Sequence, residues 1–236
     1  KNISNAALSV VINASSKALV TSQQYQGKNY FFAEVPVQSA YYTRPLPQKI
    51  ALFWDASGSG AKRDHAKEFA LLDAYFSNLN KLEVELHILR NSSPEKHTFK
   101  IQKVDWNNLK ALLENIAYDG ASNASAVQIS DQVDLALLFS DGLFNSGDVP
   151  NWSTSKPLYT ISSSTTFDAV LLRALAENSG AQSLDLLRLT KLEALQNLRK
   201  QNIRLVRILG KDSQDLVAAS PYPEAGRLHI AGIKNY

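Results

Sequence analysis

The sequence predicts an α/β protein: a doubly wound, mostly parallel sheet with one antiparallel edge strand, flanked by β-strand segments. Two observations predict it. Between residues 48 and 208, apolar runs of strand length alternate with segments of helical period. Outside that range only strand signals occur, and the flanks are therefore predicted to form part of a small β domain.

The first flank is predicted at residues 1–47. The segments 7–20 (ALSVVINASSKALV) and 28–37 (KNYFFAEVPV) are rich in β-branched and aromatic residues and show no helical period, which is typical of strands. Two prolines in the polar stretch 43–48 (TRPLPQ) then indicate a linker into the next domain.

The predicted α/β domain, residues 48–208, opens with a buried strand at 49–54 (KIALFW). Residues 61–79 follow, with apolar side chains at helical spacing. The segments 82–89 (LEVELHIL) and 97–102 (HTFKIQ), separated by a turn that contains a proline, predict a hairpin and hence the antiparallel edge strand.

Helices and strands continue to alternate in the rest of this domain. A helix is predicted at 105–116, with Asp105 as its N-cap, and another at 167–180, closed by Gly180. The remaining elements are predicted strands at 133–140 and 157–162 and a last helix at 190–202.

The second flank, residues 209–236, returns to strand signals. We expect strands at 203–209 (IRLVRIL), at the end of the α/β domain, and at 226–233 (GRLHIAGI). Neither flank is long enough to bury a core alone, so we expect the two to pair antiparallel in one β unit.

Composition excludes several classes of function. A net charge of +3 is too small to predict binding of nucleic acid or of an anionic membrane. The absence of cysteine excludes disulfides, thiol catalysis and thiolate metal sites. No apolar stretch approaches the length that spans a membrane, and no signal peptide is visible. Because the chain begins with Lys and contains no methionine, we expect it to be excised from a longer one or altered.

Oxygen-bearing side chains gather where the predicted strands end. Asp55 ends the first core strand and Asp141 follows the fourth, so both carboxylates are predicted at one edge of the sheet. Ser57 and Ser59 alternate with glycines after Asp55, and Ser122 lies in a third loop. Carboxylates and hydroxyls without a nearby His or Cys suit Mg²⁺ or Mn²⁺ better than zinc, so these five residues are the predicted metal ligands.

These motifs resemble a known family. DASGS (55–59) is similar to the D-x-S-x-S signature of the von Willebrand factor type A (VWA) domain, and SDG (140–142) matches that family's third metal-binding element. Ser122 stands where the family has threonine. LFWDASGSGAKRDHAKE (52–68) and YDGAS (118–122) more narrowly resemble bacterial relatives of inter-alpha-trypsin inhibitor heavy chains, which carry a VIT domain ahead of the A domain.

The resemblance implies a fold and a function. It implies a Rossmann-like A domain with a metal-ion-dependent adhesion site (MIDAS), and a protein partner whose acidic residue completes the metal coordination. For this chain we infer cell adhesion or protein binding, no enzymatic activity, and an extracytoplasmic location, secreted, periplasmic or on the surface, in a bacterium.

Several alternatives stay open at this stage. Asp55 also occupies the place of the nucleophile in phosphoryl-transfer hydrolases of similar fold, but these need a second Asp at position 57, where this chain has Ser. A third possibility is a scaffold whose metal site is vestigial. Ser122 is also compatible with an ordinary turn, although we favour its role as a metal ligand. Asp119 is either an outer-shell metal group or a loop cap, and we expect Lys62, Arg63 and His65 to lie on a solvated helix face.

Overall fold

The computed structural model describes residues 17–37, 42–90, 94–145, 156–201, 204–205, 207–209, 212–224 and 226–234. The chain divides into two compact units. One contains residues 42–201, and the other joins residues 1–41 to residues 202–236. No helix among the described residues is long and apolar enough to cross a membrane.

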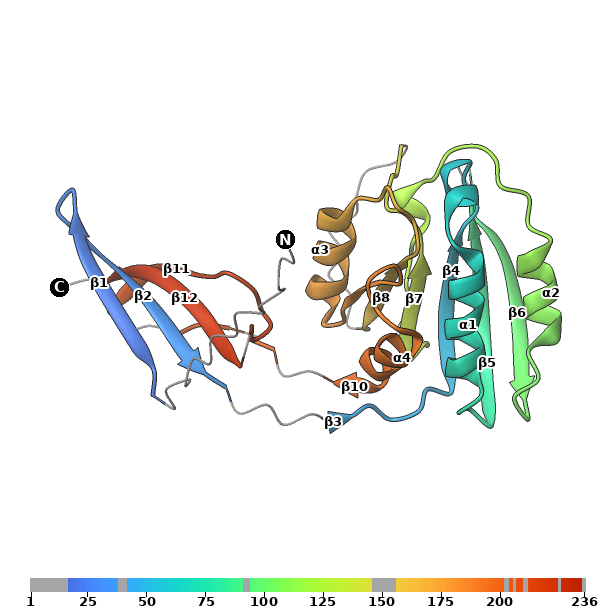
Figure 1. Cartoon of the computed structure of the whole chain (residues 1–236), viewed down its shortest axis with the longest axis horizontal. Coiled ribbons are helices and arrows are strands. Elements are labelled where there is room, and N and C mark those ends of the chain that lie inside the picture. Colours follow the sequence, from blue (N-terminus) through green and yellow to red (C-terminus); the bar gives the residue numbers. More distant parts are fainter. Residues whose placement is uncertain are drawn as a thin grey trace, which may run out of the picture. The chain divides into compact units, whose positions relative to one another are not determined.

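The α/β unit is built on a six-stranded sheet in the order β6-β5-β4-β7-β8-β9 (Figure 1). Its pairs are parallel, except that β6 runs antiparallel to β5. This confirms the predicted fold class, including the antiparallel edge strand. The strands are β4 (Lys49–Asp55), β5 (Lys81–Leu89), β6 (Glu95–Gln102), β7 (Leu135–Phe139), β8 (Leu158–Ser162) and β9 (Ser183–Asp185), and a further short pair joins β3 (Tyr42–Thr43) to β10 (Lys200–Gln201).

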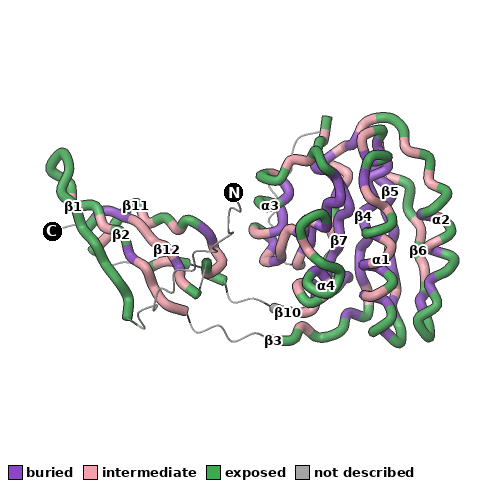
Figure 2. The backbone as a smooth tube through the Cα atoms, viewed as in Figure 1, coloured by how far each residue is buried: buried purple, intermediate pink, exposed green. Residues whose placement is uncertain are grey.

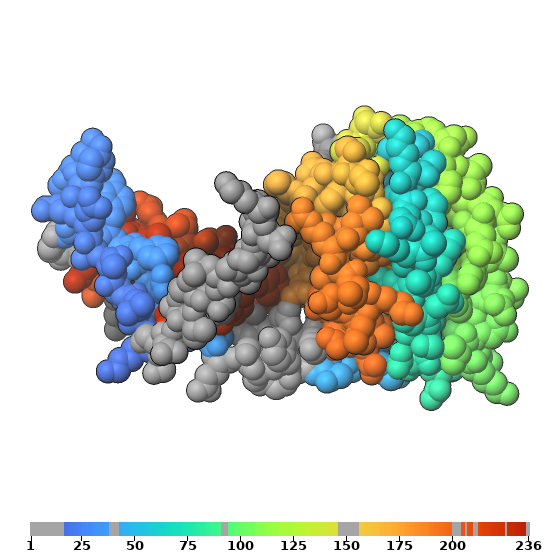
Figure 3. All heavy atoms as spheres, viewed as in Figure 1, coloured from blue at the N-terminus to red at the C-terminus, as the bar shows by residue number. Residues whose placement is uncertain are grey.

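Helices cover both faces of this sheet, which is why its central strands are buried throughout (Figure 2). Side chains of β4 alternate between two cores. Trp54 belongs to the core that includes side chains of α1, α2 and α4 on one face, and Phe53 belongs to the core that includes side chains of α3 on the other. The helices are α1 (His65–Phe76), α2 (Asn107–Glu114), α3 (Ala169–Ser179) and α4 (Lys191–Arg199), and α1 and α4 lie next to each other on the surface in Figure 3.

The second unit contains a four-stranded antiparallel sheet in the order β1-β2-β12-β11. Its strands are β1 (Leu19–Tyr25), β2 (Lys28–Pro36), β11 (Ser213–Ala218) and β12 (Arg227–Lys234). Gln26 and Gly27 both adopt positive φ, which suits the tight turn between β1 and β2. Because β2 pairs with β12, strands from both ends of the chain share this sheet. Most of the predicted strand at 7–20 lies outside the described residues.

Three expected elements differ in the structure. Helix α1 begins at His65 rather than near residue 61, because Asp64 caps it by accepting a hydrogen bond from the Lys67 amide and a 3-10 turn, η1 (Ser59–Lys62), precedes it. Asp105 is not the N-cap of α2: Trp106 holds that position, and the Asp105 carboxylate accepts from the Asn107 amide.

The third difference is the strand expected at 203–209. Residues 204, 205 and 207–209 are not in a strand, and Leu209 is 77% exposed. Strand β11 lies further along, at residues 213–218, which were predicted only as part of the second flank. An alternating pattern favours a strand only where a partner edge is available, and none of these described residues pairs with one.

A buried histidine in β5 predicts a pH dependence of stability. His87 is 7% exposed beside the Phe53 ring, and burial lowers its pKa from the ordinary value of 6.5, with the Lys96 charge adding to the effect and Glu85 opposing it. A group with a lowered pKa contributes stability above its unfolded pKa. We therefore expect the free energy of unfolding to fall as the pH drops from about 6.5 through the folded pKa, by about 1.4 kcal/mol per unit of pKa difference.

Urea unfolding of the wild type and of His87→Phe between pH 7.5 and pH 5 measures this contribution. The variant should lose less stability over that range, whereas His97→Gln, at a half-exposed edge position, should leave the loss in place. Identical pH slopes for the wild type and His87→Phe would contradict the prediction.

Candidate metal centre

The predicted site residues lie where the direction of the sheet reverses. From β4 the chain continues to β5 on one side, whereas β7, on the other side of β4, continues to β8. Ligands in open α/β sheets bind in the crevice beyond such a reversal, at the carboxyl ends of the strands. Asp55 is the last residue of β4, and Asp141 follows the end of β7 by two residues.

The first loop, residues 55–62, folds back so that its serines meet. The Asp55 carboxylate accepts a hydrogen bond from the Ser57 amide at 3.0 Å, a local turn typical of Asp. The hydroxyls of Ser57 and Ser59 lie 3.2 Å apart. Ser57 is 2% exposed, and Ser59 is half-buried.

Backbone hydrogen bonds join this first loop to the second one, residues 118–126. The Gly58 amide donates to the Gly120 carbonyl at 3.2 Å, and the Asp119 amide donates to the Ala56 carbonyl at 3.0 Å. The Asp119 side chain is 71% exposed and lies 3.7 Å from the Arg90 guanidinium. Asp119 thus connects the loops through its backbone, while its carboxylate faces solvent.

An asparagine joins the second loop to the third, residues 140–145. The Ser122 amide donates to the Asn145 side-chain oxygen at 3.0 Å, and the Asn145 amide donates to the Ser122 carbonyl at 3.3 Å. Ser122 is 0% exposed. The second and third loops are therefore held in one arrangement around Ser122.

A serine connects the third loop back to the first. The Ser140 hydroxyl donates to the Asp55 carboxylate at 2.5 Å and accepts from the Gly142 amide at 2.9 Å. The Asp141 carboxylate accepts from the Leu143 amide at 3.0 Å. Hydrogen bonds thus link all three loops in pairs, and the structure brings the five predicted residues to one edge of the sheet.

The electrostatics of this edge are unusual. Asp55 is 0% exposed and Asp141 is 1% exposed, yet neither carboxylate forms an ion pair with any residue that the structure describes. The stretch 146–155, next to the third loop, contains no Lys or Arg. Burying a carboxylate without a counter-charge costs several kcal/mol, so this edge favours a cation.

Three contributors were not predicted from the sequence. Ser140 precedes Asp141 in the sequence, but its hydrogen bond to Asp55 forms only because β7 pairs with β4. Asn145 carried no signal beyond being polar in a loop. Arg63, expected on a solvated face, is 4% exposed, because its side chain turns inward to pair with Glu68. His65 is half-buried in the same cluster, and Lys62 is exposed as expected.

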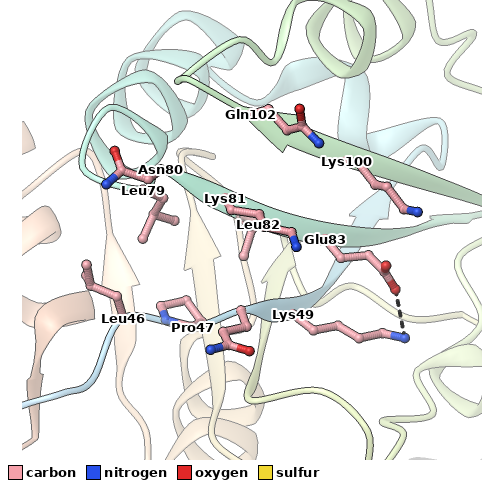
Figure 4. Close-up of a pocket in the computed structure, with 11 residues that line it drawn as sticks. Leu46, Pro47, Lys49, Leu79, Asn80, Lys81, Leu82, Glu83, Lys100 and Gln102 are labelled. Atoms are coloured by element: carbon pink, nitrogen blue, oxygen red, sulfur yellow. Dashed lines mark ion pairs between the residues drawn. The ribbon is translucent and has the colours of Figure 1, made fainter.

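A cavity of about 700 Å³ lies at the opposite end of the strands, near the start of β4 and β5 (Figure 4). Its walls include Leu79, Leu82 and Lys49, but the Lys49 ammonium is already paired with the carboxylates of Glu83 and Glu85 at 3.0 and 2.7 Å. Ligands of doubly wound sheets bind at the carboxyl ends of the strands, so this cavity does not compete with the site at Asp55.

Comparison with known proteins finds similarity among solved structures. No family model and no curated protein matches the chain. An aerotolerance-related membrane protein from Bacteroides fragilis aligns with a TM-score of 0.46 and 11% identity over 63% of this chain and 94% of that chain. The SpRpn10 VWA domain aligns with a TM-score of 0.40 and 7% identity over 59% and 87% of the two chains. Manganese-loaded TRAP from Plasmodium vivax aligns with a TM-score of 0.40 and 14% identity over 84% of this chain and 98% of that chain. Scores this low establish neither a family nor a function.

Proposed function

We propose that this chain is a metal-dependent protein-binding module that presents one Mg²⁺ or Mn²⁺ ion at the edge formed by β4 and β7. The observation that carries the proposal is the pair of buried carboxylates, Asp55 and Asp141, without a cationic partner among the described residues. A divalent cation would supply the missing charge.

The donor set fits such an ion. Ligands at adjacent corners of a Mg²⁺ octahedron, each 2.0–2.1 Å from the ion, are about 3 Å apart. The Ser57 and Ser59 hydroxyls are 3.2 Å apart and can therefore both bind one ion. Ser122 would offer a third hydroxyl, and the carboxylates of Asp55 and Asp141 would hold waters of the ion.

Neutral hydroxyls leave the ion with most of its charge. When bound, the ion would supply an electrophilic position for an Asp or Glu carboxylate of a protein partner. The motif resemblance to VWA domains supports this assignment. We further propose that the chain is related to the bacterial VIT-containing proteins and that it lies outside the cytoplasm.

We propose no enzymatic activity. A phosphoryl-transfer hydrolase of similar fold needs a second Asp two residues after its nucleophile as general acid, but position 57 of this chain is Ser. Mg²⁺-dependent hydrolysis of p-nitrophenyl phosphate that disappears in Asp55→Ala would instead favour the phosphoryl-transfer alternative.

Peptide binding tests the proposed module. We expect the immobilised protein to retain members of an Asp-containing peptide library when Mn²⁺ is present, and to release them with EDTA, because the ion provides the carboxylate contact. The matched control is the same peptides with Asp replaced by Asn, which should not be retained. Retention that EDTA leaves unchanged, or equal retention of the Asn peptides, would contradict a metal-mediated contact.

A further inference from the structure

A buried ion pair lies directly behind the first metal-binding loop. The side chains of Arg63 and Glu68 are both 0% exposed, and the Arg63 Nε donates to Glu68 Oε1 at 2.9 Å. The same guanidinium donates from Nη1 to the backbone carbonyl of Asp55 at 2.6 Å. One arginine thus ties the start of the DASGS loop to the first turns of α1.

The Glu68 carboxylate extends the cluster to two other loops. Its Oε1 also accepts a hydrogen bond from the hydroxyl of Ser163, just after β8, at 2.7 Å. Its Oε2 lies 2.9 Å from the Nδ1 of His65, whose ring stacks on Tyr118 with centroids 4.8 Å apart. Tyr118 begins the second metal-binding loop, and its hydroxyl accepts from the Trp54 indole at 2.9 Å.

Stability alone does not explain this pair. A buried ion pair is often no more stabilising than apolar side chains of the same size, because both charges must leave water. What a guanidinium provides instead is direction, since its N–H groups form a rigid planar fork. Here two positions of the fork serve two acceptors, the Glu68 carboxylate and the Asp55 carbonyl, and so fix where β4 ends.

We propose that the Arg63–Glu68 pair positions the metal centre, holding residues 55–60 in their ligand-binding arrangement before the ion arrives. This inference rests on the proposed metal-binding function. Arg63 is a positioning residue rather than a ligand or a partner contact, because its side chain is fully buried and its Nε and Nη1 already donate to Glu68 and Asp55. A loop held in advance needs less ordering when the ion binds, which raises affinity.

The test replaces both charges with apolar groups of similar length. We expect Arg63→Met/Glu68→Met to fold with a lower melting temperature, because the Asp55 carbonyl and the Ser163 hydroxyl lose their partners, and to bind Mn²⁺ at least about tenfold more weakly by calorimetry. In metal-free protein, the amides of Ser57, Gly58 and Gly60 should exchange faster than in the wild type. The matched control is Arg173→Met/Glu177→Met, which removes a partly exposed pair on α3 and should change neither readout.

A second variant, with a single substitution, keeps the test decisive if the double variant does not fold. Arg63→Lys keeps the charge, but a single ammonium group cannot reproduce the fork, so we expect a folded protein with weaker Mn²⁺ binding and faster exchange at Gly58 and Gly60. Wild-type affinity and exchange in either folded variant would overturn the inference. If the wild type itself bound no Mn²⁺, the proposed function would fail, and the exchange rates of metal-free protein would still decide whether the pair holds the loop.

Discussion

Replacing Asp55 with Ala is expected to abolish Mg²⁺ and Mn²⁺ binding. The substitution removes one of two buried negative charges at the site, and with it the acceptor for the Ser140 hydroxyl and the Ser57 amide. The first loop therefore loses both its attraction for the ion and its attachment to the third loop. Groups that orient metal ligands typically contribute 10–100-fold in affinity even without direct contact, so binding should fall below detection by calorimetry.

Two further variants test whether the charge of Asp55, rather than the size of its side chain or any carboxylate nearby, is what binds the metal. Asp55→Asn keeps the size of the side chain and one acceptor oxygen, so it should fold normally and still bind weakly. Asp119→Ala removes a carboxylate from the neighbouring loop, but that carboxylate is largely exposed, and Mn²⁺ affinity should not change. An unchanged Mn²⁺ isotherm for Asp55→Ala would show that the assignment of the site is wrong.

Adding a single methyl group at Gly60 is expected to weaken metal binding about as severely as the loss of the Asp55 carboxylate. A Cβ at this position would lie 2.8 Å from the Asp55 carbonyl oxygen and 3.2 Å from the Arg63 Nη1. These two atoms are joined by a hydrogen bond. The backbone carbonyl cannot move without displacing β4. We expect Gly60→Ala to lose about 1–3 kcal/mol of stability and most of its Mn²⁺ affinity, measured by urea unfolding and calorimetry.

Gly58 is the matched control for this prediction. It lies two residues earlier in the same loop, yet a Cβ there would meet only the Gly120 carbonyl oxygen, at an ordinary 3.8 Å. Its φ of −59° is one that any residue adopts. Gly58→Ala should therefore retain the stability and Mn²⁺ affinity of the wild type, and equal losses in the two variants would mean that loop flexibility, rather than the close approach at Gly60, matters.

The sequence predicts β4, β7 and β8 well because each is an apolar run that is buried on both faces, whereas the three-residue strand β9 gave no such signal. The same logic locates Asp55 and Asp141, since a strand end is visible wherever such a run stops at an acid. Ser140 and Asn145 escaped prediction because their hydrogen-bond partners lie in loops that are distant in sequence. Arg63 was misplaced for a related reason: a charge is assigned to the surface unless its buried partner, here Glu68, can be identified beforehand.

The antiparallel pairing of β2 with β12 has a consequence for the order of folding. Pro36 pairs with Arg227, so forming this contact in an unfolded chain closes a very long loop, at an entropic cost of about 4–5 kcal/mol. The folded α/β unit removes most of that loop, because β3 and β10 hold its first and last strand residues, Tyr42 and Gln201, against each other. Closing only the remaining connectors lowers the cost by about 1–2 kcal/mol, so loop entropy favours formation of the α/β unit before the terminal sheet.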